Sequence, residues 1–213
     1  MSRPYRFGVN LTVPAPAEQW SAKCRRAEGL GYDVIQVPDH LGMMAPFPAL
    51  VAAARATARP RLGTFVLNAG FWNPALLARE VATTDALTGG RLELGLGTGY
   101  VRAEHDTAGE LDERVARYLD FAADREEPAE LNLLMQMVVV TEDREAAVQP
   151  FLEYLPDLTT DQVLELPVFL AGTVEEITAQ VRARRERYGF TYLTVLEPYM
   201  EAFAPVMRAL RGD

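Results

Sequence analysis

The feature that most constrains this chain is the regular alternation of short apolar strands with helices over its first hundred residues. Apolar runs bounded by glycine, proline and polar residues predict strands at 5–11, 32–40, 61–68 and 91–99. Apolar residues at helical spacing predict helices at 15–31, 47–58 and 73–90. This alternation with short connections is typical of a parallel sheet, so the fold is either an open doubly wound sheet or a (β/α) barrel.

The helix at 73–90 has the clearest boundaries in the sequence. Asn73 is the predicted N-cap, Pro74 the first helical residue, and Gly89 the stop. The side chains predicted to form its apolar face are Leu76, Leu77, Val81 and Leu87.

The strand ends favour a barrel over a dinucleotide-binding sheet. Each of the four strands ends in polar residues, in the order Asn10, Asp39 with His40, Asn68, and Thr98. Barrel enzymes place their functional groups at these carboxyl ends. The glycines of "GGRLELGLGTGY" (89–100) have the spacing G-x-G-x-G, and a polar loop rather than a helix follows them. A pyrophosphate site needs that helix N-terminus, so these glycines predict a crowded barrel strand with room above it for a flat ring.

After residue 100 the pattern predicts a helix at 111–127, a fully buried strand at 130–141 and a strand at 190–198. Helices are predicted at 142–155, 159–166, 173–189 and 199–212, and 166–172 is a weaker, seventh strand. A complete eight-unit barrel takes about 250 residues. We therefore predict a single domain, 1–213, forming a TIM-type (β/α) barrel of six or seven strands, with units missing between about 105 and 130.

Charge and composition exclude several classes of function. The net charge of −9 argues against nucleic acid and anionic membrane as partners. One cysteine and two histidines offer neither a disulfide nor a zinc cluster, so no metal is predicted. No signal peptide or membrane-spanning run is present in this sequence, which predicts a cytoplasmic protein. Lys23, the only lysine, is expected to point to solvent.

Three segments carry a resemblance to a known family: "YDVIQVPDHL", "NPALLAREVATTDALTGGRLELGLGTGY" and "GTVEEITAQVRARRERYGFTYLTVLEP". Together they resemble the luciferase-like monooxygenase superfamily, most closely the branch that uses the deazaflavin coenzyme F420. The resemblance covers roughly 5–107 and 130–207. It implies a barrel with a flavin-like ring across the carboxyl ends of the strands, and hydride transfer to or from a small organic substrate, for example in secondary metabolism. It also implies a homodimer, FMN as the less favoured cofactor, and a non-prolyl cis peptide near 67–70.

The sequence departs from the family after the "GTGYVRAEHD" block. In the family, a later segment has a glycine-rich turn that binds the cofactor phosphate, and we find no match to that segment here. The barrel is therefore expected to be shortened, as in the non-fluorescent flavoprotein related to bacterial luciferase. This leaves an alternative function open. The protein would be a relative without redox cofactor, acting by acid/base cyclisation or elimination, or as a ligand-binding or partner protein.

The catalytic candidates are His40, Asp39 and Glu104. The resemblance implies a histidine beside the cofactor at position 40, and histidine exchanges protons near neutral pH. Glu104 is its predicted acid partner, while Asp39 either acts in catalysis or binds backbone.

The predicted cofactor contacts are Asn68, Gly97, Thr98, Gly99 and Tyr100. The predicted substrate contacts are Arg102, His105 and Trp72, with Arg102 suited to an anionic group. For Trp72, stacking on a ring and anchoring a dimer interface both stay open. Glu197, after the last strand, is on the correct side for a site but is a weaker candidate.

Overall fold

The structure is a computed structural model, and the chain folds into two compact units. The N-terminal unit comprises Arg6–Ala103 with Leu196–Met200, and the C-terminal unit comprises the remainder. The residues that the structure describes are 3–40, 42–97, 112–113, 115–116, 119–120, 130–155 and 158–212.

The N-terminal unit is a parallel sheet with helices on one side. The sheet strands are β1 (Arg6–Asn10), β2 (Val34–Val37), β3 (Arg61–Thr64) and β5 (Leu92–Glu93), in the order β5-β3-β2-β1. Gly8 lies opposite Val34, Val34 opposite Arg61, and Leu62 opposite Leu92. Because all four strands are parallel, their carboxyl ends meet at one edge of the sheet.

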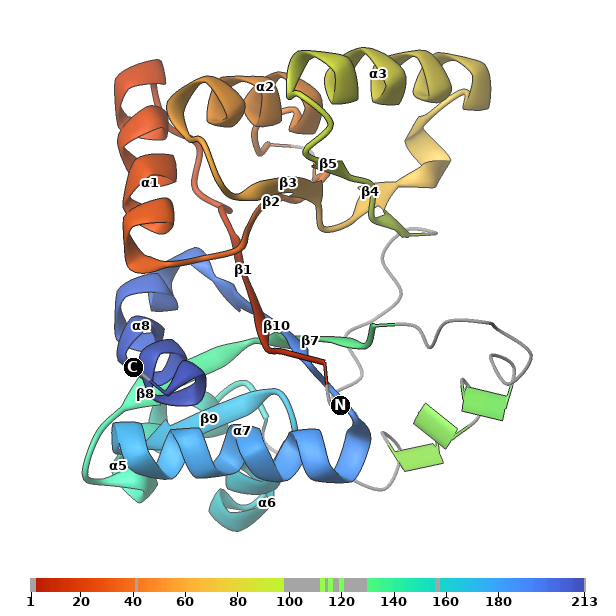
Figure 1. The fold of residues 1–213 in the computed structure, drawn as a ribbon. Coiled ribbons are helices and arrows are strands. Elements are labelled where there is room, and N and C mark those ends of the chain that lie inside the picture. Colours follow the sequence, from red (N-terminus) through yellow and green to blue (C-terminus); the bar gives the residue numbers. More distant parts are fainter. Residues whose placement is uncertain are drawn as a thin grey trace. The chain divides into compact units, whose positions relative to one another are not determined.

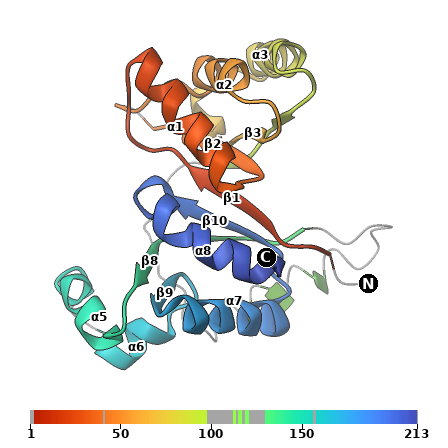
Figure 2. The ribbon, with the colours of Figure 1, turned by 60° about the vertical axis from the view of Figure 1, so that its left-hand side comes forward.

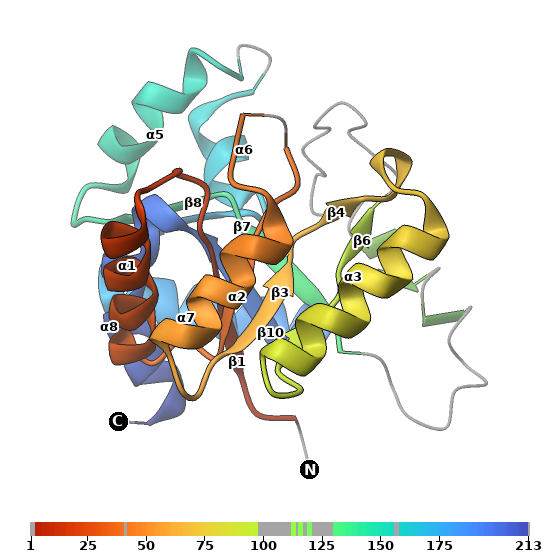
Figure 3. The same ribbon diagram turned by 90° about the horizontal axis from the view of Figure 1, so that it is seen from above.

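The helices of this unit are α1 (Ala17–Leu30), α2 (Pro46–Ala56) and α3 (Pro74–Leu87). They lie side by side over the sheet, with α2 in the middle (Figure 1, Figure 3). The buried Trp20 of α1 donates its indole N–H to the carbonyl of Ala49 in α2, at 3.0 Å. That bond satisfies the polar atom of a large side chain at the helix–helix contact.

Local signals predicted from the sequence are present at the helix ends. Gly31 ends α1 with φ of 94°, a left-handed conformation that glycine adopts without steric cost. Asn73 caps α3, with its side-chain oxygen accepting from the backbone N–H of Ala75 and Leu76. These predicted boundaries are therefore confirmed.

The predicted apolar face of α3 is only partly buried. Leu76 and Leu87 are 50% and 61% exposed, and Thr84 is the buried residue of this helix. The helix contacts α2, with Leu77 and Val81 half-buried, while Leu76 and Leu87 lie at the surface.

The C-terminal unit contains two parallel strand pairs. Strand β7 (Asn132–Met135) pairs with β10 (Tyr192–Leu196), and β8 (Met137–Val140) pairs with β9 (Phe169–Gly172). Its helices are α5 (Arg144–Leu152), α6 (Thr160–Glu165), α7 (Val174–Tyr188) and α8 (Met200–Arg211), and Figure 2 shows α7 running along β9. The weaker seventh strand of the sequence prediction is confirmed as β9.

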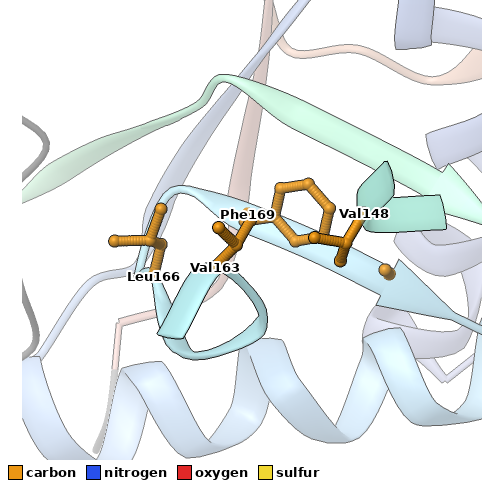
Figure 4. Close-up of a cluster of buried hydrophobic side chains, with 5 residues drawn as sticks. Val148, Val163, Leu166 and Phe169 are labelled. Carbon is orange, nitrogen blue, oxygen red and sulfur yellow. The ribbon is translucent and has the colours of Figure 1, made fainter. Parts of the chain in front are cut away.

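A small core holds α5, α6 and β9 together. The side chains of Val148, Val163, Leu166 and Phe169 point toward one another and are almost fully buried (Figure 4). Phe151 adds an edge-to-face contact to Phe169, with ring centroids 5.7 Å apart. A capping box formed by Thr173 and Glu176 starts α7, at the residue where the sequence predicts this helix to begin.

Three strands predicted as continuous are each divided in two. Residues 61–68 form β3 and β4 (Leu67–Asn68), 91–99 form β5 and β6 (Leu96–Gly97), and 130–141 form β7 and β8. In each case the two halves pair with different strands: β4 pairs with β6, whereas β3 pairs with β2 and β5. The 130–141 segment is also not fully buried, since β7 alternates half-buried and buried residues.

The break between β3 and β4 contains a non-prolyl cis peptide, between Phe65 and Val66. The resemblance implied such a bond near 67–70, so the expected feature lies slightly earlier in the chain. Within the predicted helix at 111–127, the described residues 112–113, 115–116 and 119–120 are helical, which agrees with the prediction. The other residues of this helix, and most of the region 105–130 where barrel units are predicted to be missing, lie outside the described residues.

Lys23 does not point to solvent as expected. Its ammonium group pairs with one carboxylate oxygen of Glu197, whose other oxygen accepts the backbone N–H of Val13 at 2.9 Å. Glu197 thus ties the loop after β1 to α1 within the N-terminal unit, and both of its oxygens are engaged. Among the described helices, none is long and apolar enough to cross a membrane.

Candidate functional site at the carboxyl ends of the N-terminal strands

Asp39 is the centre of the polar cluster that follows β2. Its Oδ2 atom accepts the backbone N–H of Asn68 at 3.1 Å and the indole N–H of Trp72 at 3.0 Å. The carboxylate thereby brings together three of the residues predicted from the sequence. Bonds from two N–H groups to one ionised oxygen are charge-assisted, so they hold the segment from β4 to Trp72 firmly against the end of β2.

Trp72 is fixed from a second direction. Its ring meets Phe47 of α2 edge to face, with centroids 5.3 Å apart and planes at 83°. The side chain is half-buried, so part of the ring remains accessible at the surface of the unit. This geometry leaves both predicted roles, stacking and interface anchoring, available to the exposed part.

His40 differs from its neighbour in having an exposed side chain. Its backbone carbonyl accepts the N–H of Met43 at 3.1 Å, which tightens the loop after β2. Within the described part of the chain, its imidazole makes no hydrogen bond or ion pair. The ring is therefore accessible to a ligand at the strand ends.

Asn10, at the end of β1, is a residue that the site prediction missed. It is 4% exposed, and its Nδ2 atom lies 3.4 Å from the carbonyl oxygen of Phe65. Its Oδ1 atom is buried and has no hydrogen-bond partner among the described residues. A buried acceptor left unpaired costs about 1–3 kcal/mol, so this atom is suited to accept from a bound group. The polar residue at a strand end was the sequence signal that could have identified it.

The glycines of the fourth predicted strand serve close packing. A Cβ atom on Gly95 would lie 2.3 Å from the carbonyl oxygen of Thr64, and one on Gly97 would lie 2.6 Å from Cγ2 of Val66. Thr64 also exchanges two hydrogen bonds with the backbone of Gly95, at 2.8 and 2.9 Å. The space beside these glycines is thus filled by the chain itself. A cofactor contact through the backbone of Gly97 stays a prediction.

The remaining predicted site residues lie outside the described residues. They are Thr98, Gly99, Tyr100, Arg102, Glu104 and His105. Their predicted roles, including Glu104 as the partner of His40, therefore stay predictions. In the part of the chain that the structure describes, no three acidic, histidine or cysteine side chains are grouped so as to hold a metal ion.

The protein is of the TIM-barrel type. Its strands are parallel, helices connect them, and polar groups lie at the strand ends. The fold is shared with the coenzyme F420-dependent tetrahydromethanopterin reductase of Methanopyrus kandleri, at a TM-score of 0.72 and 12% sequence identity over 97% of each chain. At that identity the likeness concerns the fold alone.

The chain belongs to the luciferase-like monooxygenase family, whose model matches residues 2–209. An F420-dependent glucose-6-phosphate dehydrogenase of Kribbella flavida is 36% identical over 129 residues, which cover 52% of this chain and 39% of that protein. The oxygenase component of a flavin-dependent trigonelline monooxygenase of Acinetobacter baylyi is 38% identical over 88 residues, covering 39% of this chain and 24% of that protein. The chain thus spans less than two fifths of the length of these curated relatives.

Proposed function

We propose that the protein is an oxidoreductase that uses a deazaflavin of the F420 type, with FMN the less favoured cofactor, and acts on a small organic substrate. The relatives named above include both F420-dependent and flavin-dependent enzymes, which supports this cofactor class. The observation that carries the proposal is the strand-end cluster. There Asp39 orders Asn68 and Trp72 while the adjacent His40 side chain stays exposed.

The described residues fit a flat heterocyclic ring. The unpaired Oδ1 of Asn10 is an acceptor that a ring N–H would satisfy. Asn68 and the backbone of Gly97 are the other proposed contacts, with Thr98, Gly99 and Tyr100 beyond them. When bound, a deazaflavin supplies a two-electron hydride acceptor or donor.

We assign proton transfer to His40. Imidazole side chains accept and donate protons near neutral pH, and this one is exposed at the strand ends. Glu104 is its proposed acid partner, and Arg102 and His105 are proposed substrate contacts. Asp39 acts as a positioning residue in this proposal, since its Oδ2 is already engaged by two N–H donors.

Titration of the purified protein with F420 and with FMN, followed by their fluorescence, tests the cofactor. We expect saturable binding of F420 with a dissociation constant well below about 1 mM, the limit of weak affinity. Binding of neither compound would contradict the redox proposal.

Replacing His40 by Ala tests the proton-transfer role. We expect F420 binding to be retained while turnover falls by about 10²–10⁴, the usual contribution of a general acid or base. The measurement is cofactor reduction with substrates of the relatives, such as glucose 6-phosphate, and Arg79→Ala on exposed α3 is the control variant. Unchanged turnover in H40A would exclude the role.

A second candidate is a family member without redox cofactor, acting by acid/base cyclisation or elimination, or as a ligand-binding or partner protein. The feature that favours it is the unmatched phosphate-binding segment after residue 107. The two candidates differ in the titration, because only the first requires F420 or FMN to bind.

We also propose that the protein is a homodimer, as the family resemblance implies. The exposed apolar side chains of α3 support an interface on this helix, because Leu76 and Leu87 are at least half exposed. Phe71, which is 55% exposed, lies just before the helix.

A further inference from the structure

The C-terminal unit contains a cavity of about 390 Å³ that is lined by α7, the end of α6 and the loop that follows α6. This volume falls within the range of small-molecule sites. Its walls come from the second half of α7 and from residues that precede β9, so it lies at the amino end of that strand. The site proposed above is built instead from the carboxyl ends of strands in the other unit.

Arg184 is the central polar residue of this cavity. Its Nε donates to the carbonyl of Pro167 at 2.8 Å, and its Nη2 donates to the carbonyls of Leu166 and Phe169 at 3.2 and 2.7 Å. The guanidinium is thus locked in place by three backbone oxygens of one loop. Its Nη1 group makes no hydrogen bond within the described part of the chain.

The positive charge of Arg184 is not neutralised by these partners. Carbonyl oxygens are neutral, and no acidic side chain among the described residues forms an ion pair with Arg184. Burial lowers the pKa of this guanidinium to about 10, with Tyr188 opposing and Arg144 adding to the shift. It therefore stays protonated at neutral pH, and a partly buried cation of this kind is stabilised by an anion.

The other charges on the cavity wall favour a singly charged ligand. Arg187 is committed to Asp112, to which it donates two hydrogen bonds. Glu165, at the end of α6, adds a negative charge to the cavity lining. In the described part of this lining, Arg184 is the one guanidinium that no carboxylate pairs with. A dianion such as phosphate would be repelled by Glu165, and Arg184 would neutralise only one of its two charges.

Most of the remaining wall is apolar; the exception is Gln180, whose side-chain amide already donates to the carbonyl of Ala171 at 2.8 Å. Leu164, Pro167, Ala183 and the ring of Tyr188 line the cavity beside Arg184. These surfaces suit the body of an aromatic or branched aliphatic molecule. We propose that the cavity binds a small monocarboxylate with an apolar body, its carboxylate pairing with Nη1 of Arg184. The proposal is independent of the function proposed for the strand-end site.

Benzoate is the probe for this site, followed by two-dimensional NMR of the labelled full chain. We expect saturable shifts at 164–167 and 183–188 with a dissociation constant of about 1 mM or tighter. Benzyl alcohol, which has the same body without charge, should bind at least tenfold more weakly. Inorganic phosphate should leave these signals unchanged. Absence of saturable shifts with benzoate, or equal binding of the alcohol, would overturn the proposal.

Two variants localise the binding without removing the Arg184 bonds to the loop carbonyls. Ala183→Phe fills the cavity and should abolish benzoate binding. Ala179→Phe is the matched control, because Ala179 is exposed on the same helix but does not line the cavity, and it should bind benzoate normally. A third variant, Arg184→Lys, does remove the guanidinium bonds, and it should weaken binding at least tenfold, since lysine lacks the planar donor fork. Retained affinity in A183F would contradict the assignment.

Discussion

At the scale of single residues, burial and partners decide what a side chain can do. Asp39 and His40 are adjacent in the sequence, yet one is engaged by two N–H donors and the other is exposed. The reactivity of Cys24 is likewise decided by its burial. It is fully buried in α1, and this burial raises the pKa of its thiol to about 12. Since the thiolate is the reactive form, Cys24 is expected to be chemically inert in the folded protein.

Thiol labelling with Ellman's reagent at pH 8 measures this inertness. An unfolded cysteine has a pKa near 8.5, so the thiolate fraction in the folded protein should be lower by about 10³. We expect labelling in native buffer to be at least about 100-fold slower than in 6 M guanidinium chloride. Comparable rates in the two conditions would show that the thiol is accessible and ionisable in the folded state.

At the scale of elements, close strand packing explains the glycine-rich sequence after α3. Gly95 approaches Thr64 so closely that no side chain fits between them. Gly29 in α1 provides a contrast, because a Cβ there would meet nothing within 4 Å. Gly95 is therefore required by close packing, whereas Gly29 is not. The sequence alone does not distinguish them, because both stand near apolar residues.

Alanine at each of these positions tests the packing argument. Gly95→Ala should lower the free energy of unfolding by about 1–3 kcal/mol through overpacking. Gly29→Ala should leave it unchanged or raise it by up to about 1 kcal/mol, because alanine favours a helix over glycine. Chemical denaturation followed by circular dichroism gives both values. A G95A protein as stable as the parent would mean that Thr64 of β3 and the residues between β5 and β6 move apart easily.

At the scale of the whole molecule, the apolar surface of α3 bears on assembly. Leu76 and Leu87 are eleven residues apart, about three helical turns, so they lie on one stripe of the helix. Leu94 and Leu96 of the same unit are also exposed. A stripe of this kind is a reason to expect association between chains.

The double variant Leu76→Glu with Leu87→Glu should convert a dimer into a monomer, because four charges would face each other in the interface. Light scattering coupled to size exclusion measures the mass. Ala78→Glu with Ala82→Glu places the same charges on the opposite side of α3, at two exposed positions, and should leave the dimer intact. A wild-type protein that is monomeric at all concentrations would refute the homodimer.

The sequence by itself determined the order of strands and helices, the helix caps and the family. These features depend on residues close in the chain, such as Asn73 with Ala75, or Thr173 with Glu176. It also indicated Asp39, Asn68 and Trp72 as neighbours of one site, because parallel strands end at a common edge.

Only the tertiary structure decided which of these residues form hydrogen bonds, where the strands divide, and where a buried charge lies. Asp39 meets a backbone N–H 29 positions away, and Arg184 meets carbonyls 15 to 18 positions away. The strand 130–141 divides because its two halves pair with different partners, β10 and β9. No local pattern encodes such contacts, since their energy comes from atoms that are brought together only when the chain has folded.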